Sequence, residues 1–233
     1  MLLPLLAILP SVLLIAYTYS KDTVEKEPLS LLFRLFFGGA LTVISAVIFG
    51  AVLEVVFEEI IEHDTLAWLI VDNFIMTALV EEGGKYFALK RITWRSREFD
   101  YVFDGIVYAV VASLGFATIE NVLYLLDGNL STAIMRAVFS VPGHAIYGVF
   151  MGSFYGLAKR FDSTGHPRKC RANLRHALWV PVLIHGFYDF CLSSKDSRLI
   201  CVFFVFEIVV TILAFRRVRK FSRDDAPVTD SAE

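Results

Sequence analysis

Long, uninterrupted apolar blocks constrain this chain more than any other feature. Several of them exceed the roughly 18 apolar residues that a helix needs to cross a hydrocarbon core of about 30 Å. Hydrophobic residues make up 56% of the 233 residues and charged residues only 20%, which is unlike a soluble domain. Backbone polar groups in lipid must be satisfied within their own segment. We therefore expect an all-α, polytopic transmembrane helical bundle.

The blocks, bounded by charges and turn residues, predict about seven spans. Their approximate ranges are 2–20, 29–53, 65–89, 104–126, 131–158, 174–194 and 199–215. Acidic residues continue the second block beyond residue 53, where an extra interfacial helix is compatible with the pattern. We expect residues 1–215 to form one integral membrane domain, and residues 216–233 to form a basic-to-polar, disordered cytoplasmic tail.

The placement of Lys and Arg predicts the orientation. Basic residues follow every second span, at Lys21 and Lys26 and within 90–97, 159–175 and 216–223. The loops at 54–64 and 127–130 contain none. Since cytoplasmic loops retain basic residues, we expect the N-terminus outside and the C-terminus in the cytoplasm, in the inner cell membrane. We expect the lipid bilayer as a partner and no nucleic acid, and the sequence indicates no oligomeric state.

Ionisable side chains inside the predicted spans mark a candidate site. They are Glu81, Glu82, Lys85, Glu120, Arg136, His144, His185 and Asp189. A carboxylate at the bilayer centre is disfavoured by about 2.5–3.5 kcal/mol, so such a group implies mutual pairing, access to water and a function that maintains it. A spacing of four residues places Glu81 on the helix face of Lys85, and His185 on the face of Asp189. We expect these side chains to line one cavity.

The adjacent glutamates Glu81 and Glu82 favour acid-base chemistry. Two carboxylates in a low-dielectric site cannot both ionise cheaply, so at least one can exchange a proton with water, as a general base does. The structural alternative is that both only form ion pairs with Lys85 and Arg136. Asn121 has two interpretations as well, because its amide could polarise a carbonyl group or form a plain interhelical hydrogen bond.

The histidines leave two interpretations open. His185 could stabilise an oxyanion or shuttle a proton. It could instead join His144, Asp189 and a glutamate such as Glu82 as ligands of a divalent metal, with zinc as the candidate. The sequence has no HExxH motif, which is the strongest sequence signal of a metalloprotease.

Four short motifs in this region resemble those of PrsW-type intramembrane proteases. In chain order they are EExxK at 81–85, FxxxEN at 116–121, HAxxG at 144–148 and HxxxD at 185–189. Each lies on a separate predicted span, and the resemblance covers about residues 65–195. PrsW proteins are similar to the wider group of CAAX prenyl endopeptidases. That group typically carries His where this chain has Glu120, which argues against an isoprenyl substrate.

The resemblance implies an intramembrane endopeptidase that hydrolyses a peptide bond in or beside the bilayer. It implies that Glu81 or Glu82 activates water, that Glu120 belongs to the catalytic set and that His185 stabilises the oxyanion. The supporting residues would be Lys85, Asn121, His144 and Asp189. By the same resemblance, the substrate would be a single-span membrane protein similar to an anti-sigma factor. The alternatives are a zinc protease that uses His144, His185, Glu82 and Asp189, and a proton-coupled transporter that uses the carboxylates as a relay.

Overall fold

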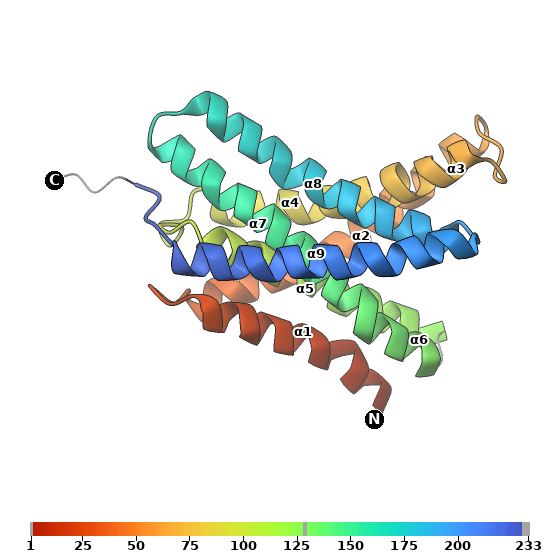
Figure 1. Cartoon of the computed structure of the whole chain (residues 1–233), viewed down its shortest axis with the longest axis horizontal. Helices are drawn as coiled ribbons and strands as arrows, with labels where there is room; N and C mark the ends of the chain where they lie inside the picture. The colour runs from red at the N-terminus through yellow and green to blue at the C-terminus, as the bar shows by residue number, and fades with distance from the viewer. Residues whose placement is uncertain (1, 128–129, 230–233) are drawn as a thin grey trace.

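The computed structural model describes residues 2–127 and 130–229, and it folds them into long helices that run side by side (Figure 1). The helices are α1 (Leu2–Lys21), α2 (Leu29–Glu58), α3 (Leu66–Ile70), η1 (Val71–Leu79), α4 (Val80–Thr93), α5 (Asp104–Asp127), α6 (Leu130–Met135), η2 (Arg136–Ser140), α7 (Val141–Ser163), α8 (Pro167–Ser193) and α9 (Ser197–Arg223). Across the described ranges there is no strand, only an isolated bridge between Tyr101 and Pro227. The expected all-α membrane bundle is confirmed.

The third and fifth predicted spans are each built from consecutive helical segments. The π-helical segments η1 and η2 lie between α-helical turns in these two spans. A π-helix widens the turn and often occurs at functional sites. Among the described residues, four helices are long and apolar enough to cross a membrane: Leu29–Glu58, Asp104–Leu125, Leu130–Ser163 and Ser197–Arg223. The total of seven spans stays a prediction.

Two chain segments differ from the expectation. The acidic residues after position 53 continue α2 to Glu58 and do not start a separate interfacial helix. Helix α9 extends to Arg223, and the segment after it pairs with the loop before α5. The Val102 N–H donates to the Ala226 carbonyl at 3.0 Å, and the Val228 N–H donates to the Asp100 carbonyl at 2.7 Å. Residues 216–229 are therefore not the disordered tail that composition predicts, and 230–233 lie outside the described residues.

Helix α5 forms the centre of the bundle, where it packs against α2 and α7. It is largely buried, whereas α2 and α9 expose most of their apolar side chains, as expected of helices that face lipid. The contact between α5 and α7 is backbone to backbone. A Cβ atom on Gly152 would lie 2.3 Å from the Gly105 carbonyl oxygen, so this approach requires glycine. The close packing aligns the polar positions of α5 and α7.

Candidate active site

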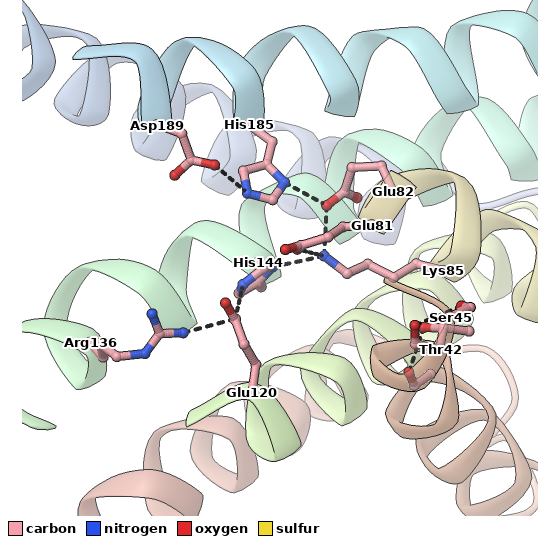
Figure 2. Close-up of polar contacts among 11 residues, drawn as sticks. Thr42, Ser45, Glu81, Glu82, Lys85, Glu120, Arg136, His144, His185 and Asp189 are labelled. Atoms are coloured by element: carbon pink, nitrogen blue, oxygen red, sulfur yellow. Dashed lines mark hydrogen bonds and ion pairs between the residues drawn. The ribbon is translucent and has the colours of Figure 1, made fainter. Parts of the chain in front are cut away.

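Side chains from α4, α5, α7 and α8 meet inside the bundle around the Lys85 ammonium group (Figure 2). The Lys85 Nζ atom lies 2.7 Å from Glu82 Oε1, 3.2 Å from Glu81 Oε2 and 3.0 Å from His144 Nδ1. It also lies 3.9 Å from the centroid of the Phe116 ring, within the range of a cation–π interaction. Lys85 is fully buried. One cation of α4 thus holds two carboxylates of its own helix and an imidazole of α7.

His185 is held between two carboxylates. Its Nδ1 atom lies 3.0 Å from Glu82 Oε1, and its Nε2 atom lies 3.1 Å from Asp189 Oδ2. Because a carboxylate only accepts hydrogen bonds, both ring nitrogens carry protons in this arrangement and the ring is positively charged. The Tyr147 ring stacks on it, with centroids 4.6 Å apart and planes at 19°. Packing and hydrogen bonds therefore fix the orientation of His185.

His144 has the opposite protonation pattern. Its Nδ1 atom accepts from Lys85, while its Nε2 atom donates to Glu120 Oε2 at 2.9 Å, so the ring is neutral. The same Glu120 oxygen lies 2.8 Å from an Arg136 guanidinium nitrogen. Arg136 also donates from Nε to Asn121 Oδ1 at 2.7 Å. Asn121 thus makes an interhelical hydrogen bond that orients Arg136 toward Glu120.

A cavity of about 510 Å³ opens beside these groups. Its polar lining residues are Asp72, Asn73, Thr77, Glu81, Glu120, Tyr124, Arg136, Ser140, His144, Tyr147, His185, Tyr188, Asp189 and Ser193. The adjacent glutamates differ in their access to this cavity. The Glu81 side chain lines it and is 13% exposed, whereas Glu82 does not line it and is completely buried. Glu81 is therefore the carboxylate of the pair that can meet water.

A second cavity, of about 290 Å³, reaches the same site from the side of the bundle. It lies between α2, η1 and α5, and its walls include Val47, Gly50 and Met76 as well as Glu81 and Glu120. Val47 is 62% exposed on the outer face of α2. This cavity therefore joins the carboxylates to the surface that faces lipid.

The site contains one group of side chains suited to a metal ion. Glu81, Glu82 and His144 each offer a donor atom, and these atoms lie within 4.8 Å of one another. Carboxylate oxygen and imidazole nitrogen are donors that zinc accepts, and Glu82 Oε2 is buried without a hydrogen-bond partner in the described part of the chain. The donor atoms that converge are not those of the sequence-based set, because Glu81 takes the place of His185 and Asp189. These carboxylate and imidazole donors fit a metal, which would replace the Lys85 ammonium group as their shared partner.

Several residues of the cavity wall were not identified from the sequence, among them Asp72, Tyr124 and Tyr147. Arg136 was predicted as an ionisable residue of the site, but as a partner of Glu81 and Glu82 and not of Glu120. Tyr147 was not identified at all, although it lies three residues after His144 within the HAxxG motif. That spacing places both side chains on one helix face and was the available signal.

The chain is similar to known membrane proteases. A family model described as PrsW family intramembrane metalloprotease matches residues 27–215. The chain belongs to the PrsW family. It is 35% identical over 213 residues to Protease PrsW of Oceanobacillus iheyensis, which covers 91% of this chain and 93% of that protein. The resemblance carried by the four motifs is confirmed, and the protein is an intramembrane protease.

Further relatives support the assignment over most of the chain. Protease PrsW of Geobacillus kaustophilus is 38% identical over 187 residues, covering 80% of this chain and 78% of that protein. Protease PrsW of Bacillus subtilis is 36% identical over 191 residues and covers 82% of each chain. No solved structure gives a significant match. The PrsW family match extends on both sides of the motif region at 65–195.

Proposed function

We propose that this protease cleaves a single-span membrane protein, similar to an anti-sigma factor, in or near its membrane-spanning part, with Glu81 as the general base. One observation carries the choice of base: Glu81 lines the cavity, whereas the adjacent Glu82 is sealed from it. A general base must reach the water from which it takes a proton. Family membership favours hydrolysis over the transporter alternative.

The reaction follows from the cavity wall. Glu81 takes a proton from a water molecule, and the water oxygen forms a bond with the carbonyl carbon of the substrate. The Glu81 proton then passes to the amide nitrogen as the carbon–nitrogen bond breaks, which restores the carboxylate. Lys85, 3.2 Å away, holds the Glu81 side chain in place. Proton transfer by a positioned side chain contributes about 10²–10⁴-fold to the rate.

Positive charge on the same wall suits the developing oxyanion. The His185 ring and the Arg136 guanidinium group both line the cavity. Because the cavity lies within the bundle, their charges are weakly screened and stabilise a negative transition state more strongly than they would in water. Glu82 and Asp189 act as positioning residues, since each bonds one nitrogen of His185.

A metal ion at Glu81, Glu82 and His144 would supply an additional source of activation. When bound, such an ion polarises a carbonyl group and lowers the pKa of a bound water molecule. Loss of cleavage on chelation, with recovery on addition of zinc, is the test of this alternative.

The side cavity and the charge distribution support a route for the substrate and an orientation. A membrane-spanning substrate that moves within lipid would reach Glu81 and Glu120 through the cavity between α2 and α5. The basic residues gather at the end of the bundle where α1 ends and α5 and α8 begin (Figure 1). By the positive-inside rule this end faces the cytoplasm of a bacterial inner membrane.

Co-expression with candidate single-span substrates tests the proposal. The wild type should release a product cut in or near the substrate span. The Glu81→Gln variant should lose cleavage by about 10²–10⁴-fold, because the amide cannot take the proton. The exposed Glu62→Gln serves as a matched control and should cleave normally. Normal cleavage by Glu81→Gln would contradict the assignment of the base.

A further inference from the structure

A second group of buried carboxylates lies far from the active site, at the basic end of the bundle. Asp22 and Glu27 belong to the loop between α1 and α2, and Asp104 is the first residue of α5. Their exposed fractions are 1%, 4% and 1%. One oxygen atom from each carboxylate lies within 4.8 Å of the other two. We call Asp22, Glu27 and Asp104 the basic-end triad.

Two members of the triad accept hydrogen bonds from neutral donors. The Tyr108 hydroxyl group donates to Glu27 Oε2 at 2.5 Å. The backbone N–H groups of residues 100 and 101 donate to Asp104 Oδ2 at 3.1 and 2.7 Å. These bonds orient the carboxylates but add no positive charge.

The third member has a buried oxygen atom with nothing to bind. Asp22 Oδ2 is inaccessible to solvent, and no hydrogen-bond partner for it exists in the described part of the chain. The ammonium group of Lys26, in the same loop, bonds to the backbone carbonyls of Tyr19 and Asp22. A buried carboxylate oxygen without a partner is strongly unfavourable, and a bound cation would remove that cost.

The described residues contain no ion pair between the triad and a Lys, Arg or His side chain. The Lys26 ammonium group acts on Asp22 electrostatically but forms no ion pair with it. Three carboxylates that converge with so little counter-charge form a ligand set for a cation. The donors are all oxygen atoms, which magnesium, manganese and calcium prefer over the softer metals.

We propose that Asp22, Glu27 and Asp104 bind a hard divalent cation at the basic end of the bundle. Oxygen ligands of calcium lie at about 2.3–2.6 Å from the ion and those of magnesium at about 2.0–2.1 Å, so two ligands on opposite sides of one ion are roughly 4–5 Å apart. The separations within the triad fall inside this limit. The Asp22 oxygen without a partner becomes a ligand.

The cation would fasten separate parts of the chain to α5. It joins the loop between α1 and α2 to the first turn of α5, next to the place where Asp225 accepts a hydrogen bond from the Phe103 N–H at 2.9 Å. The same helix carries Glu120 toward its other end. The site therefore holds the central helix of the active site from outside the membrane.

Manganese binding to the purified full chain in lipid nanodiscs tests this inference. After treatment with EDTA, Mn²⁺ is titrated and the free ion is measured by electron paramagnetic resonance. The Glu81→Gln variant separates the two sites, because it removes a donor from the intramembrane set and leaves the triad intact. We expect one Mn²⁺ per chain in that variant, displaced by Mg²⁺ or Ca²⁺.

Variants of the triad sharpen the test. Added to Glu81→Gln, Asp22→Asn or Glu27→Gln should weaken Mn²⁺ binding on the order of tenfold or more, because each removes a charged ligand. Glu25→Gln, an exposed carboxylate of the same loop, should leave binding unchanged. In EDTA, Asp22→Asn should unfold at the same or a higher temperature than its parent, since it removes an uncompensated buried charge. Absence of Mn²⁺ binding in Glu81→Gln, or equal binding with and without Asp22→Asn, would overturn the inference.

Discussion

Two buried groups of acidic side chains lie in this bundle, and they are neutralised in different ways. In the active site, Glu81 and Glu82 share the ammonium group of Lys85, and Glu120 contacts Arg136. In the basic-end triad, the carboxylates accept only neutral donors. The first group carries its own counter-charges within the chain, whereas the second offers its charge to a cation from solution.

Location explains the difference. A carboxylate inside the hydrocarbon layer must be inserted there together with a partner, because a free ion does not enter lipid readily. A carboxylate at the end of the bundle borders water, from which a cation can be supplied. Because the counter-charge of Glu81 is the Lys85 side chain, it also holds Glu81 in a defined position beside the cavity. The comparison thus separates a site built for chemistry from a site suited to holding helices together.

The largest expected effect is that of Lys85→Met, which removes the central counter-charge. Two buried carboxylates would then lack their partner, and breaking a buried ion pair destabilises a protein by about 3–5 kcal/mol. We expect a loss of that order in the free energy of unfolding, measured by titration with SDS, together with loss of cleavage. Lys220→Met, at an exposed position of α9, is the control. Equal effects of both changes would show that Lys85 does not hold the active site together.

Ala46→Trp tests whether the active site is reached from the lipid side. Ala46 lines the side cavity but not the larger cavity, so a bulky ring there should obstruct a membrane-spanning substrate. Misplacement of a substrate by about 1 Å costs roughly 100-fold in rate, and we expect a reduction of that size. Cleavage of a short soluble peptide should stay at the wild-type rate. An equal loss for both substrates would argue against lateral entry.

Tyr108→Phe should have the smallest effect, and that effect should depend on the cation. It removes the hydroxyl group that donates to Glu27 Oε2, and a hydrogen bond to a charged group contributes about 1.5 kcal/mol. We expect that loss of unfolding free energy in EDTA and a smaller loss in Mg²⁺, because the ion also stabilises Glu27. Tyr19→Phe, whose hydroxyl group makes only a 3.4 Å bond to the Glu27 carbonyl, is the control. If Tyr108→Phe lost the same unfolding free energy in EDTA and in Mg²⁺, Tyr108 would not contribute to a cation site.

The helices could be predicted from the sequence because apolar block length determines which segments suit a membrane. Glu81, Lys85 and His185 could be identified because an ionisable residue inside an apolar span is costly, and such residues mark functional sites. The access of Glu81 and not Glu82 to the cavity could not be predicted. It depends on how α4 is rotated against its neighbours, and adjacent residues on a helix differ only in direction.

Features that depend on contacts between distant segments also could not be predicted from the sequence. Residues 224–229 have the composition of a disordered segment, yet the backbone groups of Ala226 and Val228 pair with those of Val102 and Asp100, which lie far away in the sequence. Asp22 and Asp104 lie in regions that the sequence marks only as polar ends of spans. Their convergence follows from the packing of α1 against α5, which no local pattern encodes.

Chemical rescue tests the role of Glu81 most directly. In Glu81→Ala the missing carboxylate leaves space beside the cavity, so added formate can take its place and accept the proton. Glu82 is sealed from the cavity, so formate cannot replace it in Glu82→Ala. We predict that formate restores measurable cleavage to Glu81→Ala and none to Glu82→Ala. Rescue of Glu82→Ala without rescue of Glu81→Ala would contradict the assignment of Glu81 as the base.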